Sequence, residues 1–99
     1  MKKFRIIVHC TNLNVPEEES GKIIIGFYAT RYGRGQSIEE AFEKVKRNLE
    51  NEDDFKKSSK ITKQRSQLQP ILEIEEFEVV PFYSDLFFKG KGYTFYPAE

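Results

Sequence analysis

The sequence predicts an α+β fold: an antiparallel sheet in ββαβ order, with one main helix on one face and an aromatic C-terminal extension. Three observations predict it. Residues 22–32 are apolar, β-branched and aromatic, residues 38–49 repeat apolar side chains at helical spacing, and residues 4–11 and 71–80 alternate between apolar and polar side chains. We expect a single domain over residues 1–99, because this length suffices for one modest core.

Composition narrows the functional classes. Lysine and arginine number 16, as do aspartate and glutamate, so the formal charge is zero and no overall field draws the chain to nucleic acid or an anionic membrane. No stretch approaches the ~20 apolar residues that span a bilayer. A single cysteine, Cys10, fits a reducing compartment, and the apolar run near the start is too short for a signal peptide. We therefore expect a cytoplasmic protein with no membrane partner.

The first two strands are predicted over residues 4–11 and 22–32, with a polar connection between them that contains proline and glycine. Side chains alternate across a strand, so the second strand has two rows. The row expected to face the helix is Ile23, Ile25, Phe27 and Ala29. The row expected to face away is Ile24, Tyr28, Thr30 and Tyr32. Bulk on both faces favours a central strand over an edge strand.

A glycine-rich turn, Gly33-Arg34-Gly35-Gln36, precedes the predicted helix. Ser37 is placed to cap the helix, and Glu40 three residues later would complete a capping box. One apolar stripe follows the helical period, formed by Ile38, Ala41, Phe42, Val45 and Leu49. We expect this stripe to cover one face of the sheet.

Residues 50–69 hold few large apolar side chains, so we expect a mobile loop there, within which a short helix could form. Residues 70–81 predict the next strand, but the apolar phase slips, which indicates a β-bulge near Glu75-Glu76. The glutamates of this stretch indicate a face open to water, or an edge kept from pairing.

The C-terminal extension, residues 82–99, is strongly aromatic. One helix covers one face of a sheet, so the other face needs the extension, a second subunit or both to cover it. We therefore expect a homodimer that uses this face or the extension. The candidate interface residues are Ile24, Tyr28, Tyr32, Phe87 and Phe95.

No catalytic constellation, metal cluster or cofactor motif stands out. His9 and Cys10 are neighbours in a strand, so their side chains point to opposite faces and cannot easily act as base and nucleophile. We expect no catalytic residue, no metal and no cofactor. The alternative interpretation of the glycine-rich turn is an anion site at the helix start, where Arg31 and Arg34 would join Gly35 and Ser37.

Two family resemblances follow from particular motifs. The stretches 26–32, 37–41, 72–76 and 92–97 resemble a family of small bacterial proteins of uncharacterised function, with a Gly-Phe-Tyr-Thr-Thr-Arg-like strand and a Gly-Phe-Thr-Phe-Tyr-Pro-like C-terminus. Separately, residues 35–42 resemble the turn and helix of the HicB-type antitoxin N-terminal domain. No DNA-binding element of that family follows here, so this second resemblance implies partner binding rather than repression.

The leading functional hypothesis is a small non-enzymatic protein-interaction module that associates with itself. The first alternative is an antitoxin-like binder of a toxin or nuclease. The second alternative is an anion or nucleic-acid binder through Arg31 and Arg34, with Tyr28 and Tyr32 available to stack on bases. An enzyme ranks last, because no nucleophile and base are placed together.

Overall fold

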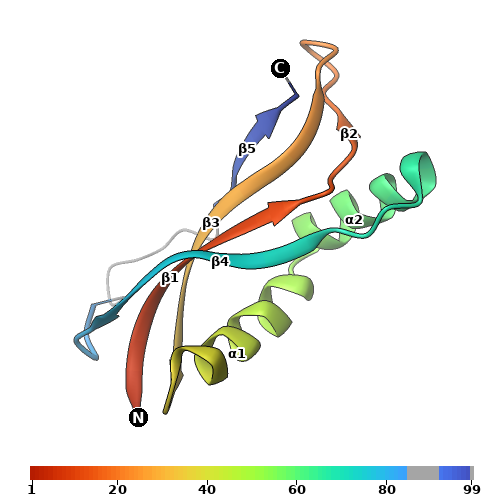
Figure 1. Cartoon of the computed structure of the whole chain (residues 1–99). Helices are drawn as coiled ribbons and strands as arrows, with labels where there is room; N and C mark the ends of the chain where they lie inside the picture. Colours follow the sequence, from red (N-terminus) through yellow and green to blue (C-terminus); the bar gives the residue numbers. More distant parts are fainter. Residues whose placement is uncertain (85–91, 99) are drawn as a thin grey trace.

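The computed structural model describes residues 1–84 and 92–98 and consists of one antiparallel sheet with two helices (Figure 1). Along the chain the elements are β1 (Lys2–Thr11), β2 (Val15–Pro16), β3 (Ile23–Gly35), α1 (Ile38–Glu50), α2 (Asp53–Ser66), β4 (Ile71–Val80) and β5 (Thr94–Pro97). The α+β class and the antiparallel sheet are confirmed. The expected ββαβ order with one main helix is too simple, because β2, α2 and β5 add to it.

β3 is the central strand of the sheet. It pairs antiparallel with β1 over Lys2–Cys10, and the short β2 continues the β1 side of the hairpin, since the Leu13 amide donates to the Ile25 carbonyl and Val15 pairs with Ile24. A strand has two edges, so β5, which also pairs with β3, lies on the opposite edge from β1. β4 lies beyond β1 and ends the sheet.

The pairing of β4 with β1 confirms the predicted bulge. The register shifts between Ile7, which is opposite Glu76, and Val8, which is opposite Ile74, so Glu75 is the additional residue. Without this residue the two halves of β4 would present their apolar side chains to opposite faces. The bulge brings Leu72, Ile74, Phe77 and Val79 onto the face that β1 buries.

The two rows expected for β3 are only partly correct. Phe27 and Ala29 face the helices as predicted, and both are buried. Ile24 and Ile25 are exchanged: Ile24 is 8% exposed and belongs to the core, whereas Ile25 is 38% exposed. The cause is an irregularity in the pairing with β5 between Ile24 and Gly26, which reverses the alternation of side chains.

Helix α1 begins as the sequence predicts. The Ser37 hydroxyl accepts a hydrogen bond from the Glu40 amide at 3.2 Å. Instead of closing the capping box, the Glu40 carboxylate lies 3.7 Å from the Lys44 ammonium group, one turn along the helix. The stripe of Ala41, Val45 and Leu49 is buried, and Ile38 and Phe42 pack at its margin.

Helix α2 occupies the stretch where the sequence predicted a loop. It is 14 residues long and buries only Phe55 and Thr62. Their partners come from different parts of the chain: the Phe55 ring meets the Phe27 ring edge-on at 6.3 Å, and the Thr62 hydroxyl accepts from the Asn14 backbone amide at 2.9 Å. Arg65 Nε also donates to Asn14 Oδ1 at 3.0 Å. The helix is therefore held here by tertiary contacts, which a count of apolar residues does not reveal.

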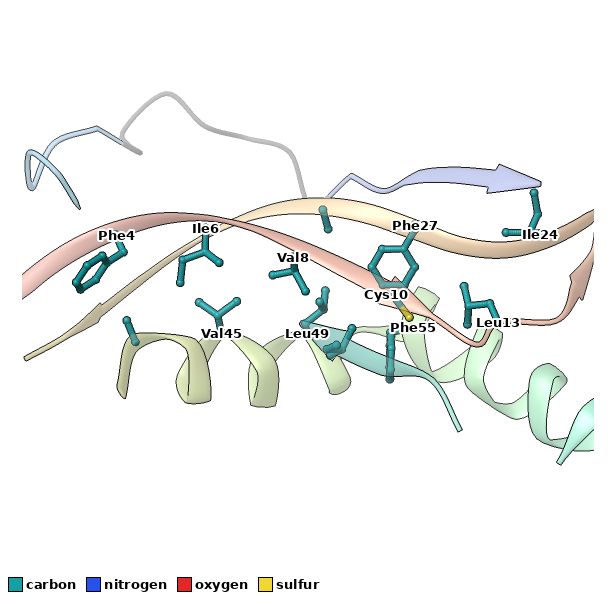
Figure 2. Packing of buried hydrophobic residues seen from close by; sticks show 13 residues of the cluster. Phe4, Ile6, Val8, Cys10, Leu13, Ile24, Phe27, Val45, Leu49 and Phe55 are labelled. Atoms are coloured by element: carbon teal, nitrogen blue, oxygen red, sulfur yellow. The ribbon is translucent and has the colours of Figure 1, made fainter. Parts of the chain in front are cut away.

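The core lies between the sheet and the helices (Figure 2). Phe4, Ile6, Val8 and Cys10 of β1 point down onto Val45 and Leu49 of α1, and Phe27 of β3 points toward Phe55 of α2. In Figure 1 both helices lie on this one side of the sheet. Across residues 1–84 and 92–98, no helix has the length and apolar character needed to cross a membrane.

Candidate functional site

The outer edge of β4 is open in the part of the chain that the structure describes. β4 ends the sheet, and within residues 1–84 and 92–98 no strand pairs with its outer edge. α1 lies beneath β1 and β3, so it does not cover the part of β4 that lies beyond these two strands (Figure 1). Phe77 is 47% exposed and Val79 is 59% exposed, although both are on the face that β1 buries. We call Ile74, Phe77 and Val79 the apolar strip.

The other face of β4 carries a glutamate row, which consists of Glu73, Glu75, Glu76 and Glu78, all exposed. Two of the four have a nitrogen-bearing side chain from β1 beside them. Arg5 Nε donates to Glu78 Oε1 at 2.7 Å, and His9 Nδ1 lies 3.7 Å from Glu75 Oε2. The Glu78 contact raises the pKa of Arg5 through its hydrogen bond and its charge. Glu73 and Glu76 have no ion-pair partner in the described part of the chain.

An aromatic cluster on the same face ties β5 to the sheet. The His9 ring stacks on Tyr28, with centroids 4.4 Å apart, and His9 Nε2 forms a hydrogen bond with the Tyr96 hydroxyl at 2.6 Å. Tyr96 reaches His9 by passing directly over Gly26, where there is no side chain. Burial is the main reason that the pKa of Tyr96 is raised. The contacts of this cluster join three strands, so its evident task is structural.

His9 and Cys10 do not form a catalytic pair. The His9 ring is on the face with Tyr28, whereas the Cys10 side chain is fully buried in the core on the other face. Burial raises the pKa of the Cys10 thiol to about 12, so it stays protonated and a poor nucleophile near neutral pH. In the residues that the structure describes, no three His, Cys, Asp or Glu side chains are grouped to hold a metal ion.

The predicted anion site is not assembled, because its residues point in different directions. Arg31 pairs with the buried Ile6 and faces the helices, whereas Arg34 pairs with Lys3 and is exposed. Arg31 donates Nε and Nη2 to the two carboxylate oxygens of Glu52, at 3.0 and 2.8 Å.

The other two members of that site have structural tasks. Gly35 packs against α1 so closely that a Cβ there would lie 2.8 Å from the Ala41 nitrogen. The Ser37 hydroxyl already caps the helix. Arg31 and Arg34 lie on opposite faces of β3, and the hypothesis that they act together on an anion or a nucleic acid stays a prediction.

Arg31 instead belongs to a buried network that the sequence did not reveal. The Tyr93 hydroxyl donates to Glu52 Oε1 at 2.5 Å, and Arg31 Nη1 donates to the carbonyls of Thr30 and Gly92. Burial opposes the charge of Arg31, but its hydrogen bonds and attraction to Glu52 outweigh that effect and its pKa is raised. Burial and the Glu52 carboxylate raise the pKa of Tyr93 well above its usual range. The network joins β3, the α1–α2 junction and the chain before β5.

The expected interface residues fall in several places. Ile24 is in the core, which removes it from any surface. Tyr28 is 36% exposed beside His9, and Lys3 Nζ lies 5.7 Å from the centre of the Tyr32 ring. Phe95 is paired with Phe27 across β3 and β5, with ring centroids 5.6 Å apart. Phe87 lies outside the described residues.

Comparison with other proteins adds no assignment: no family model, curated protein or solved structure matches this chain. Both resemblances noted in the sequence therefore stay predictions. The β4 edge was partly foreseen from its glutamates and its slipped phase. The Arg31–Glu52 pair and the His9–Tyr96 contact were not foreseen, because each joins residues far apart in sequence without a local pattern.

Proposed function

We propose that this protein is a small non-enzymatic protein-interaction module that docks other proteins along the outer edge of β4. The observation that carries the proposal is the unpaired edge together with the exposed apolar strip beside it. Ten residues of strand give a docking line of about 33 Å. Edges of this kind offer a row of backbone donors and acceptors to a second strand.

The buried groups of the rest of the molecule support a non-enzymatic role. Arg31, Glu52 and Tyr93 satisfy one another, and His9 and Tyr96 hold β5 in place. These polar side chains are therefore engaged in joining elements. The outer edge of β4 has an apolar side and an acidic side, which suits recognition of a protein segment.

A pull-down from the native host with matched variants tests this function. Wild-type protein and the Phe77→Lys/Val79→Lys variant are used as bait, and captured proteins are quantified by mass spectrometry. The control bait is Ile25→Lys/Leu68→Lys, which changes two exposed apolar residues outside β4. We expect a host protein that the wild type and the control capture and the β4 variant loses. Equal capture by all three baits would contradict the proposal.

Self-association is a second candidate, favoured by the apolar strip. Two β4 strands can pair antiparallel with their apolar rows on the same face. This pairing places Ile74 opposite Phe77 and Leu72 opposite Val79. The same pairing places Glu73 opposite Glu78 and Glu75 opposite Glu76, and like charges directly opposite are destabilising. We therefore expect self-association to be weak at low salt.

Sedimentation velocity at low and high salt tests this second candidate. At about 1 M NaCl charges are screened beyond about 3 Å, so the dimer fraction is expected to rise. The Glu73→Gln/Glu76→Gln variant is expected to dimerise more strongly than the wild type already at low salt. A dimer that salt and these substitutions leave unchanged would use another surface.

A further inference from the structure

The strand that β4 already pairs with shows what its outer edge is suited to bind. On the inner edge of β4, apolar residues of β1 meet the apolar strip: Val8 is opposite Ile74, Ile6 is opposite Phe77 and Phe4 is opposite Val79. On the other face, basic residues of β1 meet the glutamate row, with Arg5 opposite Glu78 and His9 opposite Glu73. Apart from Ile7, which is opposite Glu76, the partner of β4 within the fold therefore alternates between apolar and basic side chains.

The glutamate row has more negative charge than β1 neutralises. Arg5 contacts Glu78, and His9 approaches Glu75 only at 3.7 Å. Glu73 and Glu76 are exposed and have no ion-pair partner among the described residues. Side chains on an added strand would lie directly beside this row, because neighbouring strands are about 4.8 Å apart. Cationic side chains at those positions would be attracted, and carboxylates would be repelled.

The apolar strip determines which residues would alternate with the cationic ones in an added strand. Phe77 and Val79 stay about half exposed even though β1 covers their inner side. A strand added at the outer edge would place its alternate residues on the same face as this strip. Apolar residues at those positions would cover Phe77 and Val79 and remove them from water.

We infer that the outer edge of β4 binds, by strand addition, an extended segment of a partner protein in which lysine or arginine alternates with apolar residues. This inference rests on the proposed function and specifies its partner. A second β4 fits the edge less well, because it brings glutamates opposite glutamates. An acidic segment fits less well because it also brings carboxylates opposite the glutamates. A uniformly polar segment fits less well because it leaves the apolar strip uncovered.

A peptide with the sequence of residues 2–11, carrying Cys10→Ser, is the probe, since it reproduces the pattern that β4 already accepts. It is labelled and titrated against the full chain by fluorescence anisotropy, up to about millimolar concentration. A peptide of the same composition in scrambled order, which loses the alternation, is the control for charge alone. We expect the scrambled peptide to bind at least about tenfold more weakly.

Two charge-matched protein variants locate the site. Glu73→Lys/Glu76→Lys reverses the unpaired part of the glutamate row, and we expect it to bind the probe at least about tenfold more weakly. Glu18→Lys/Glu19→Lys makes the same charge change in the exposed turn between β2 and β3, and we expect it to match the wild type. Hydrogen exchange measured with and without the probe should show added protection at residues 71–80.

The outcomes separate the inference from the proposed function. Equal binding of both peptides, equal effects of both charge reversals, or protection outside residues 71–80 would each overturn strand addition by a basic segment. Absence of any probe binding would do the same. If the pull-down nevertheless shows a host protein that depends on Phe77 and Val79, the proposed function stands with a partner of different chemistry.

Discussion

Gly26 is the residue that allows β5 to join the sheet. Tyr96 crosses β3 at this position to reach His9, and a Cβ on residue 26 would lie 2.5 Å from the Cys10 carbonyl oxygen and closer still to the Tyr96 phenol. The phenol could move aside, but the backbone carbonyl belongs to the central β1–β3 ladder. The need for glycine here is therefore steric rather than conformational.

Gly26→Ala is expected to lower the free energy of unfolding by about 1–3 kcal/mol, because the new methyl group overpacks the site. Urea unfolding followed by circular dichroism measures this change. Gly92→Ala is the matched control, since nothing lies within 4 Å of a Cβ at that position, and it should stay within about 0.5 kcal/mol of the wild type. Equal effects of the two substitutions would mean that Tyr96 does not pack over residue 26.

Cys10 makes the free energy of unfolding depend on pH in the alkaline range. Burial raises the pKa of its thiol from its usual 9.0 to about 12, so the folded protein keeps a proton that the unfolded chain releases at lower pH. The contribution is complete below about pH 9 and is lost as the pH rises toward 12. The raised pKa values of Tyr93 and Tyr96 act in the same direction.

The free energy of unfolding is therefore expected to fall between about pH 9 and about pH 12. Urea unfolding at several pH values measures the slope. The Cys10→Ala variant should be less stable throughout because it leaves a small cavity, but its slope should be shallower. A slope that is the same with and without the thiol would contradict the burial of Cys10.

At the scale of elements, a helix or a bulge could be predicted from the sequence where the residues that cause it are close together in the chain. The β4 bulge follows from the slipped phase of apolar residues around Glu75, and α1 follows from Ser37 and its stripe, so both were foreseen. For α2 the sequence predicted only a loop in which a short helix could form, because Phe55 and Thr62 are held by Phe27 and by the Asn14 backbone amide, which are distant in sequence. Arg31 was misjudged for the same reason: Glu52, 21 positions away, binds its guanidinium group.

The small number of buried residues in α2 makes it the weaker helix. Phe55→Ala is expected to lower the free energy of unfolding by about 3–5 kcal/mol, as for other buried phenylalanines. Hydrogen exchange should show the loss of protection first in Asp53–Ser66, while α1 stays protected. The control is Lys57→Ala on the exposed side of α2, which should have little effect. Uniform loss of protection in both helices would show that they unfold as one unit.

At the scale of the whole molecule, helices cover one face of the sheet, and the outer edge of β4 has no strand beside it in the described part of the chain. Two helices cover one face, and β5 with the His9–Tyr96 cluster occupies the outer edge of β3 (Figure 1). β4 receives neither a helix along its full length nor a second strand in the described part of the chain. The expectation that a partner covers the aromatic face stays a prediction, and our proposal places the partner at the β4 edge instead.

Amide hydrogen exchange along β4 in the free protein, resolved residue by residue by NMR, tests the openness of this edge most directly. In an antiparallel pair, amides that bond to the neighbouring strand alternate with amides that point the other way. We therefore expect slow and fast exchange to alternate through Ile71–Val80, with the fast amides becoming slow when the basic peptide is added. Slow exchange at every position in the free protein would contradict the account, because it would show that the outer edge is already paired.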